Sequence, residues 1–538
     1  MFDHSSFNEE HRFGSGGFAN EADIERAGLL LGKGLPLGFV GERQLCLDAD
    51  APLISICGAG SGKTRDLLGY VMCGANIGPL MVLDPRGELS AISLHTLAPA
   101  NVYGYYFNPM QMCSLPSHSC NLLDILDLSS PNFHADARFI TEGIIPLPPG
   151  AKEPYFTLRA RDWVEAILKA RTEKNGSTSF PDLYDVINWI EGDGLAWADE
   201  LEFMLCSRFP EVRRTAAEML AKQQDSQREF GSILGEIYAH LSFLSDPTLR
   251  RSLQGDDFSV GDLVRADRTC RIHLNIPAEY LGLWSPIIRS FFTVAMLYKG
   301  RKPAARRVHL ICDEAGQLGR FEALIRAFTY GRGAGIRTWA LFQDTGQIIR
   351  NFEPSAIASF LGSAQVRQFF GVRDFQTAKL VSDMLGQQTL EYDDQRYQEE
   401  ARRYRLQTLQ NMFGGGDPFA SAFEFEHYGH ASQRKSKQAR AVMSPNEILA
   451  LPEDRQILFV SGQNIKPIIA NKYPYFTRKE MAGRYLPNPY HPPSDRVKVM
   501  THSGAAWASV IETPVPDYLS HFPQYSTGRA LKIVEYPI

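Results

Sequence analysis

The sequence lacks an apolar run long enough to cross a membrane. Its most apolar early stretch, residues 27–41, is interrupted by Gly32, Lys33, Gly34 and Pro36. A spanning helix needs ~20 consecutive apolar residues. The first residues, Met-Phe-Asp-His, do not form the basic and apolar regions of a signal peptide. We therefore expect a soluble chain with no transmembrane segment of its own.

The sequence also lacks paired cysteines and an excess of positive charge. Its eight cysteines include no Cys-x-x-Cys pair, which argues against a disulfide framework or a zinc site and indicates reduced thiols in the cytosol. The formal net charge of −5 predicts no overall basic surface, so nucleic-acid contacts would need local patches. Two basic clusters, within 402–405 and 434–440, are candidates, although such runs are more often solvated faces.

What the sequence does contain is a phosphate-binding loop. An apolar strand pattern over residues 52–57 is followed by small residues, and then a helical pattern begins. Glycines allow backbone N–H groups to surround phosphate oxygens at a helix N-terminus. Cys57 stands where the usual pattern begins with glycine, and we interpret it as a tolerated small residue. The predicted nucleotide-binding residues are Gly58, Ala59, Gly60, Ser61, Gly62, Lys63, Thr64 and Arg65.

Individual roles follow from the chemistry of this loop. Lys63 would reach the β- and γ-phosphates of ATP, and the Thr64 hydroxyl would bind Mg²⁺. A second apolar run, residues 308–312, ends in Asp313 and Glu314. Asp313 would hold Mg²⁺ through water, and Glu314 would orient or deprotonate the attacking water. An acidic pair alone could be a helix cap, but with the phosphate loop in the same chain it indicates a nucleotide-hydrolysing site.

Two further polar residues follow in the chain. Arg332 lies on a glycine-rich turn, where it could be an arginine finger acting on a neighbouring subunit or an ordinary solvated arginine. Gln343 ends the next apolar strand pattern, residues 338–342. A polar residue at that position can sense the γ-phosphate.

The pattern of helices and strands predicts an α/β fold with an all-helical insertion. We expect an N-terminal arm over 1–35, a discontinuous nucleotide-binding domain over 36–150 and 256–486, and helices over 151–255. The proline-rich tail, 487–538, shows too little periodicity for an assignment. Residues 393–440 read as a charged, turn-rich segment, and Ser226 with Glu229 resembles a capping box.

Six segments in this order resemble the type IV secretion coupling proteins, the ATPases of conjugative DNA transfer. They are residues 58–64, 82–89 (Val-Leu-Asp-Pro-Arg-Gly-Glu-Leu), 311–319, 331–337, Gln343 and 451–454. The resemblance covers roughly residues 40–480. It implies a RecA-like P-loop NTPase domain with an inserted all-α domain. Asp84 lies in the second segment, without an assigned chemical step.

The resemblance also implies partners. We expect ATP and Mg²⁺ as cofactors and a homo-hexamer with ATP between subunits, so that Arg332 acts in trans. Relaxase-bound single-stranded DNA or protein effectors would be the substrates. The inserted domain would recognise them, through exposed charges such as Arg213, Arg214 and Glu218. Most members of the family begin with membrane-spanning helices, so here a partner among the inner-membrane secretion components would recruit a cytoplasmic chain to the membrane.

Three functions follow from these observations. The first is a coupling ATPase for relaxase-bound single-stranded DNA, and the second a coupling ATPase for protein effectors or a related hexameric DNA pump. The third is an adaptor in which nucleotide only controls assembly. Glu314 argues against the adaptor, because a pure binding module needs no water-activating carboxylate.

Overall fold

The computed structural model describes residues 11–74, 77–94, 97, 101–147, 154–415, 417–431, 435–526 and 531–535. The chain divides into two compact units. The larger spans Glu21–Val372, Pro452–Ile465 and Ile469–Ile538, and the smaller spans Met1–Asn20, Arg373–Leu451 and Lys466–Ile468. Among the described helices, none is both long and apolar enough to cross a membrane.

An eleven-stranded sheet forms the centre of the larger unit. Its order is β2-β1-β13-β12-β9-β3-β8-β7-β4-β6-β5, and the seven strands from β9 to β5 run parallel. Every residue of β3, β7 and β8 is buried, as expected for parallel strands covered on both faces. The strands are β1 (Leu35–Val40), β2 (Arg43–Leu47), β3 (Leu53–Cys57), β4 (Leu80–Leu83), β5 (Val102–Phe107), β6 (Thr269–Leu274), β7 (Val308–Cys312), β8 (Ile336–Phe342), β9 (Val366–Phe370), β12 (Arg455–Val460) and β13 (Ile468–Asn471).

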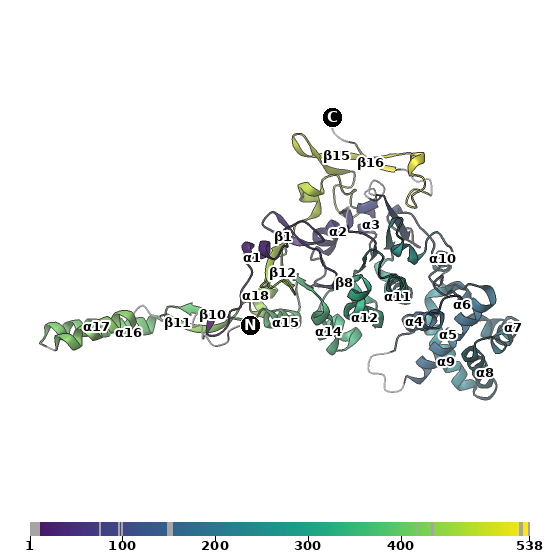
Figure 1. The fold of residues 1–538 in the computed structure, drawn as a ribbon, viewed down its shortest axis with the longest axis horizontal. Helices are drawn as coiled ribbons and strands as arrows, with labels where there is room; N and C mark the ends of the chain where they lie inside the picture. Colours follow the sequence, from purple (N-terminus) through teal and green to yellow (C-terminus); the bar gives the residue numbers. More distant parts are fainter. Residues whose placement is uncertain are drawn as a thin grey trace. The chain divides into compact units, whose positions relative to one another are not determined.

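Helices cover this sheet. Figure 1 shows α2 and α3 above the strands and α12 and α14 below them. The connection after β3 begins with a π-helical segment, η2 (Lys63–Leu68). The α-helices here are α2 (Gly69–Cys73), α3 (Glu88–Ser93), α4 (Phe133–Ile144), α11 (Ser285–Arg301), α12 (Glu322–Tyr330), α13 (Thr345–Phe352) and α14 (Ser355–Ser363). Short 3₁₀ segments are η4 (Met112–Ser114), η5 (Ser242–Ser245), η6 (Val260–Val264), η7 (Ala278–Tyr280), η8 (Ala315–Gln317), η9 (Gly331–Ala334), η10 (Tyr475–Thr477), η11 (Lys479–Met481) and η12 (Asp517–Leu519).

Between β5 and β6 the chain forms a helical bundle, and its described residues from 154 to 264 contain no strand. Trp163 and Phe230 pack together in its core, with ring centroids 5.2 Å apart, which fits their interpretation as core residues. The expected capping box is wrong: Ser226 makes no side-chain cap bond, and Glu229 pairs with Lys222 instead. The bundle comprises α5 (Tyr155–Asn175), α6 (Phe180–Gly192), α7 (Gly194–Leu205), α8 (Pro210–Asp225), α9 (Gln227–Leu241) and α10 (Pro247–Ser252).

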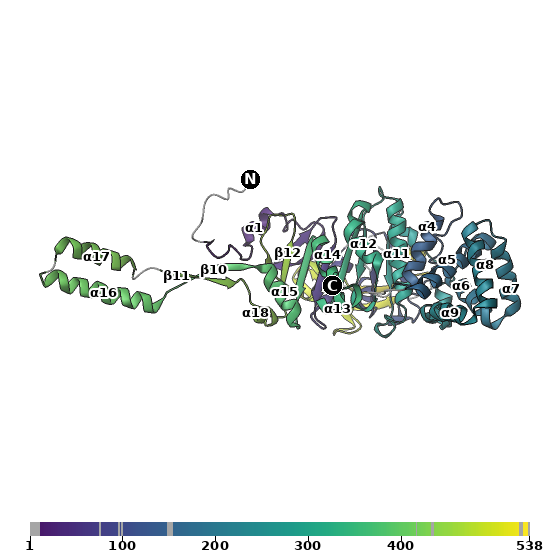
Figure 2. The same ribbon diagram turned by 90° about the horizontal axis from the view of Figure 1, so that it is seen from below.

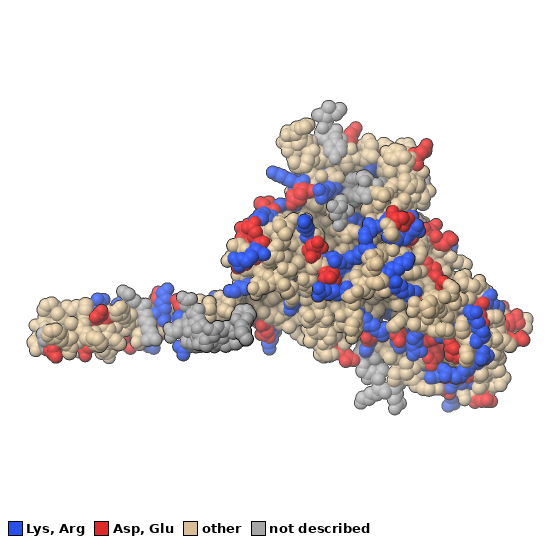
Figure 3. Space-filling model, viewed as in Figure 1, with Lys and Arg blue, Asp and Glu red and all other residues tan. Residues whose placement is uncertain are grey.

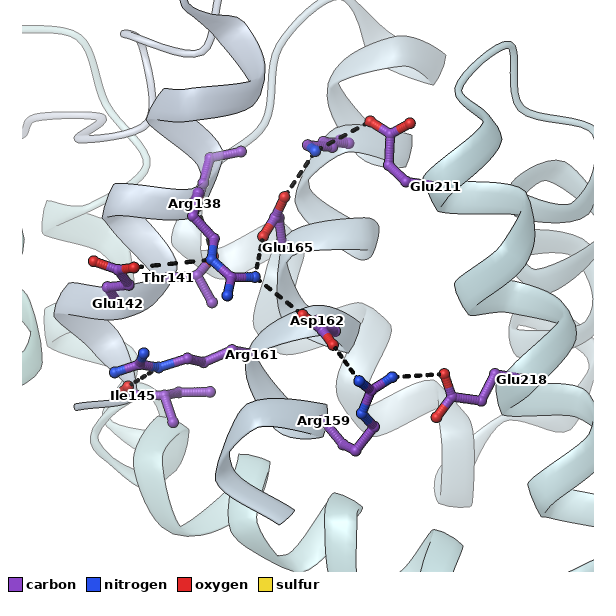
Figure 4. A network of polar contacts seen from close by, with 12 residues as sticks. Arg138, Thr141, Glu142, Ile145, Arg159, Arg161, Asp162, Glu165, Glu211 and Glu218 are labelled. Carbon is purple, nitrogen blue, oxygen red and sulfur yellow. Dashed lines mark hydrogen bonds and ion pairs between the residues drawn. The ribbon is translucent and has the colours of Figure 1, made fainter. Parts of the chain in front are cut away.

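Ion pairs join α5 to its neighbours α4 and α8 (Figure 4). The Arg138 guanidinium on α4 contacts Asp162 at 3.0 Å and Glu165 at 3.1 Å. Arg159 contacts Glu218 on α8 at 3.1 Å. Glu218 therefore already has an intramolecular partner, and it is a weaker candidate for substrate contact than the sequence suggests.

Both ends of the larger unit contain structure that the sequence did not predict. Within the expected arm, α1 (Glu21–Arg26) buries Ile24, and Leu29 is also buried. In the tail, β14 (Arg496–Thr501), β15 (Gly504–Thr513) and β16 (Leu531–Glu535) form an antiparallel sheet. A short period-2 pattern explains β14, because Val497 and Val499 are buried between exposed or half-buried neighbours.

The smaller unit corrects the prediction of a turn-rich segment at 393–440. Two antiparallel helices, α16 (Gln395–Phe413) and α17 (Pro418–Ala431), lie side by side beyond a two-stranded ribbon of β10 (Gln387–Tyr392) and β11 (Ser436–Ala441) (Figure 2). Glu, Gln, Arg and Leu in α16 are good helix formers, and Asp394 caps it by accepting from the Tyr397 N–H. The unit also holds α15 (Phe375–Leu385) and α18 (Pro445–Leu449). Arg434 of the predicted basic cluster lies outside the described residues.

Candidate nucleotide-binding site

Four parallel strands, in the order β3-β8-β7-β4, end at the same edge of the sheet. The loops that follow them bring most of the predicted residues together around a cleft of about 460 Å³, although Gly58, Ser61 and Arg332 do not line it. This is the edge where open α/β sheets bind ligands. The cleft is lined by Ala59, Gly60, Gly62, Lys63, Thr64, Arg65, Asp84, Pro85, Arg86, Glu88, Ala278, Leu281, Asp313, Glu314, Gln317, Gln343 and His491.

The glycine loop has the backbone that its sequence requires. Gly60 and Gly62 have φ values of +73° and +89°, and a Cβ on Gly62 would lie 2.1 Å from the Asp66 carboxylate. Cys57 is buried at the end of β3, and its thiol lies 3.6 Å from the Phe342 carbonyl on β8. Burial raises the pKa of Cys57 to about 12. A neutral, small side chain is therefore accommodated where the usual pattern has glycine.

Lys63 lies against the two carboxylates that follow β7. Its Nζ is 3.1 Å from Asp313 Oδ1, and it also donates to Glu314 Oε1. Burial lowers the pKa of Lys63, but the Asp313 and Glu314 charges outweigh it and raise that pKa above its ordinary value. Burial, reinforced by Glu314 and opposed by Lys63, raises the pKa of Asp313. The lysine therefore keeps its charge between two carboxyl groups.

Glu314 is fixed on both sides. Its backbone is left-handed, with φ of +58°, and its second oxygen, Oε2, accepts from Gln343 Nε2 at 2.9 Å. The Gln343 backbone N–H in turn donates to Gln347 Oε1 at 2.9 Å. Gln347 is buried against Gly316, where an added Cβ would lie 2.1 Å from its amide oxygen. Sequence reasoning missed Gln347, although Asp344 capping a helix at Gln347 N–H was a readable signal.

A second missed residue is Lys472, which follows β13. Its buried Nζ donates to the Ser61 carbonyl at 2.6 Å, lies 3.6 Å from the Asp66 carboxylate and faces the Phe370 ring at 4.2 Å. Burial lowers the pKa of Lys472, against the attraction of Asp66. Lys472 therefore stabilises the glycine loop through a hydrogen bond to the Ser61 carbonyl. No local pattern around residue 472 indicates this, because the contact joins segments some 400 positions apart.

Asp84, at the end of β4, is buried beside the cleft. Its Oδ2 accepts from the backbone N–H and the hydroxyl of Ser90, both at 2.8 Å. Burial raises the pKa of Asp84 to about 6, although these bonds oppose the rise. The Asp-Pro-Arg-Gly-Glu segment thus forms the turn between β4 and α3, and it contributes one wall of the cleft.

Arg332 does not reach the cleft of its own chain. It lies in η9, before the start of β8, and because β8 and β3 are parallel this is the opposite edge of the sheet from the glycine loop. Its side chain is largely exposed, and its Nε contacts Asp50 at 3.2 Å. Any action of Arg332 on a nucleotide must therefore involve another subunit.

Together, the glycine loop on β3, the acidic pair after β7 and the strand order define a RecA-like P-loop NTPase fold with an all-α domain. The chain belongs to the family described as Type IV secretory system Conjugative DNA transfer, which it matches over residues 23–494. The sequence prediction of this family and of this fold class is therefore confirmed.

Individual relatives are distant. The type IV secretion system-coupling protein VirD4 of Bartonella quintana is 23% identical over 459 residues, which is 82% of this chain and 65% of the relative. The conjugal transfer protein TraG of Rhizobium radiobacter is 26% identical over 268 residues, 49% of this chain and 37% of the relative. The chain thus spans less than two thirds of the length of these relatives.

Solved structures show the same fold. The plasmid coupling protein TrwB in complex with ADP and Mg²⁺ superposes with a TM-score of 0.59 at 15% identity, covering 85% of this chain and 93% of that one. TrwB in complex with a non-hydrolysable ATP analogue gives a TM-score of 0.57 at 16% identity, with coverage of 85% and 93%.

Proposed function

We propose that the chain is an ATP-hydrolysing coupling protein that delivers relaxase-bound single-stranded DNA to a type IV secretion channel. The observation that carries the proposal is the convergence of Lys63, Asp313, Glu314 and Gln343 on one cleft in a member of the conjugative DNA-transfer family. The TrwB structures with ADP and Mg²⁺ or an ATP analogue support nucleotide as the ligand.

The residues of the cleft fit ATP and Mg²⁺. Positive φ at Gly60 leaves its face open, with no atom near an added Cβ, so phosphate oxygens can approach the backbone N–H groups. Lys63 exchanges its carboxylate partners for the phosphates, while Thr64 and Asp313 hold the metal. Mg²⁺ supplies charge neutralisation on the phosphates. The N-terminal dipole of the helix that begins at Lys63 adds to the attraction.

For hydrolysis, Glu314 would hold the attacking water. A second residue would respond to the presence of the γ-phosphate. Because Glu314 is bound by both Lys63 and Gln343, a ligand that draws Lys63 away leaves the carboxylate on Gln343 alone. Gln343 then senses the γ-phosphate through Glu314. In a homo-hexamer, Arg332 of one subunit would supply positive charge to the site of the next.

The inserted helices, over about 151–255, would recognise the relaxase or a protein substrate. Arg214 on α8 is exposed and is the better candidate for such contact than Glu218, which pairs with Arg159. Recruitment to the inner membrane by other secretion components remains our expectation for the assembled system.

The proposal is tested by ATP hydrolysis measured with and without single-stranded DNA, double-stranded DNA and candidate effector proteins. Stimulation by single-stranded DNA supports delivery of relaxase-bound DNA. Stimulation only by duplex DNA would indicate a DNA pump, and stimulation only by protein would indicate an effector-coupling ATPase. Nucleotide binding with no turnover under any condition would indicate an adaptor and overturn the enzymatic proposal.

A further inference from the structure

The end of the hairpin formed by α16 and α17 has very few charges and several large apolar side chains. Within residues 406–423, Asp417 is the single charged residue. Arg405 and Glu424 stand immediately outside this range; further charges of both signs lie on α16, and Glu426 lies on α17. In Figure 3 the far end of the hairpin is accordingly mostly tan. We define residues 406–423 as the hairpin tip.

Large apolar side chains of the tip face solvent. The exposed fractions are 63% for Leu406, 80% for Phe413, 87% for Phe419 and 76% for Phe423. Exposed apolar residues occur singly on most proteins, but a cluster of large ones marks a surface that contacts something else. The cluster includes residues of both helices, on either side of the glycine-containing turn.

The contact between the two helices leaves the large apolar side chains of the tip uncovered. The side chains buried along α16 are Gln398, Ala401 and Thr408, which are polar or small. Thr408 donates its hydroxyl to the Tyr404 carbonyl at 2.9 Å and so needs no water. Leu409, Phe425 and Tyr428 are half-buried between the helices, whereas Phe413, Phe419 and Phe423 of the tip are left outside. Exposed phenylalanines at the end of a hairpin are expected where the surroundings of that end are apolar.

We propose that the tip inserts into the boundary between headgroups and acyl chains of a lipid bilayer. Residues 406–413 form two turns of helix, ~12 Å long at 1.5 Å per residue. That length matches a segment that enters one face of a membrane, for which burial is about 5–10 Å, and falls far short of a span. Within the hairpin, the most exposed large side chains that lack a polar atom, Leu406, Phe413, Phe419 and Phe423, all lie in the tip. The exposed large side chains nearer the base of α16, Tyr397 and Tyr404, end in a hydroxyl, which suits the headgroup level of a membrane.

The charged residues next to the hairpin tip limit how deeply the tip enters the bilayer. Arg402, Arg403 and Arg405 lie on the turn that precedes the tip, and long basic side chains are stable at headgroup level. Glu424 and Glu426 follow the tip on α17, so the base is of mixed sign. Binding should therefore depend on the phenylalanines far more than on anionic lipid or salt. This inference does not depend on ATP hydrolysis.

Flotation of the purified full-length chain with phosphatidylethanolamine–phosphatidylglycerol vesicles tests it. The wild-type chain should float with vesicles at both 0.1 and 0.5 M salt. Burying a phenylalanine is worth about 1.5–3 kcal/mol, so Phe413→Ser and Phe419→Ser should each weaken partitioning about tenfold or more. Leu195→Ser is the matched control, since Leu195 on α7 is also 83% exposed and should leave flotation unchanged.

A second measurement is independent of any loss of folding. Phe419→Trp keeps the apolar surface, and brominated lipids should quench its added fluorescence, while Leu195→Trp should stay unquenched. ATP hydrolysis without DNA should be the same in all five variants. The inference is overturned if the wild-type chain does not float or if the serine variants float equally well. It is also overturned if the wild-type chain does not bind vesicles and the serine variants form smaller oligomers, because the phenylalanines then hold copies of the chain together.

Discussion

Gln343 donates its side-chain amide to Glu314 Oε2 at 2.9 Å, while Lys63 holds the other oxygen of the same carboxylate. Residues from the ends of β3, β7 and β8 thus meet on one carboxyl group. If Lys63 leaves Glu314, the hydrogen bond between Glu314 and Gln343 must change as well. The structure thereby connects the lysine expected to meet the phosphates with the glutamine expected to sense them.

Lys63 and Glu314 should fail differently when substituted. Lys63→Ala removes the positive charge expected at the phosphates and leaves two carboxyl groups facing each other, so ATP affinity should fall on the order of a hundredfold. Glu314→Gln keeps the shape of the side chain, so ATP should bind while turnover falls about 10²–10⁴-fold. Fluorescent-nucleotide binding and phosphate release distinguish the two; normal turnover by Glu314→Gln contradicts the assignment of Glu314.

Gln347 should act through Gln343. Gln347→Leu removes the acceptor of the Gln343 backbone N–H, and because one such hydrogen bond contributes about 0.5–1.5 kcal/mol, turnover should fall up to about tenfold with little change in KM. Arg350→Ala on the exposed side of the same helix is the control and should be unchanged. An equal rise in KM with unchanged kcat would show that Gln347 supports substrate binding instead.

Much of this site was predictable because its residues are adjacent in sequence to buried strands. The glycine loop, the acidic pair and Gln343 each follow an apolar run, and parallel strands bring such positions to one edge. The sequence signals only the helix that Asp344 caps at Gln347, and it signals nothing at Lys472. The roles of these two residues depend on the Gln343 N–H and on the Ser61 carbonyl, which no local pattern reveals.

The errors in the fold have physical reasons of the same kind. The sequence predicts a turn-rich segment at 393–440 because charges interrupt the apolar periodicity there, yet Glu, Gln and Arg favour a helix even without an apolar stripe. The strands β14 to β16 escaped prediction because prolines around them mask short alternating segments. In both cases, contacts with a neighbouring element stabilise a structure that local sequence specifies weakly.

Arg332 should complement a defective site in a neighbouring subunit. Arg332→Ala should lower turnover by about 10³–10⁵-fold, the range for arginine fingers, while mixed rings with Lys63→Ala subunits should regain part of the activity. The physical reason is that a mixed interface can combine an intact nucleotide site with an intact arginine. Asp50→Asn, which removes the ion pair of Arg332 in its own chain, should change turnover no more than about twofold. Mixed rings that form but stay inactive would exclude the trans role.

Asp84 should make stability depend on pH in the mildly acidic range. Its pKa is raised to about 6 by burial, so the folded state binds this proton more tightly than the unfolded state. The resulting stabilisation is complete below the unfolded pKa of about 3.9 and is lost as pH rises through about 6. Asp84→Asn cannot lose a proton, so its stability relative to wild type should increase by roughly 1 kcal/mol between pH 5 and pH 8. Urea unfolding at both pH values measures this, and a constant difference would contradict the raised pKa.

Arg214 and Glu218 should separate substrate recognition from stability within the helical bundle. Glu218 binds Arg159 at 3.1 Å, and both side chains are half-buried, so Glu218→Ala should lower the free energy of unfolding by up to about 1 kcal/mol. Arg214 is exposed on the same helix, and Arg214→Glu should leave unfolding and basal ATP hydrolysis unchanged. If Arg214 contacts an acidic surface of the relaxase or effector, Arg214→Glu should weaken binding of that protein, because the reversed charge repels acidic groups. The transfer frequency should then fall severalfold. Both variants should be compared with wild type for transfer, and Glu218→Ala should be measured at a permissive temperature. If both transfer as well as wild type, this face of α8 is not part of the recognition surface.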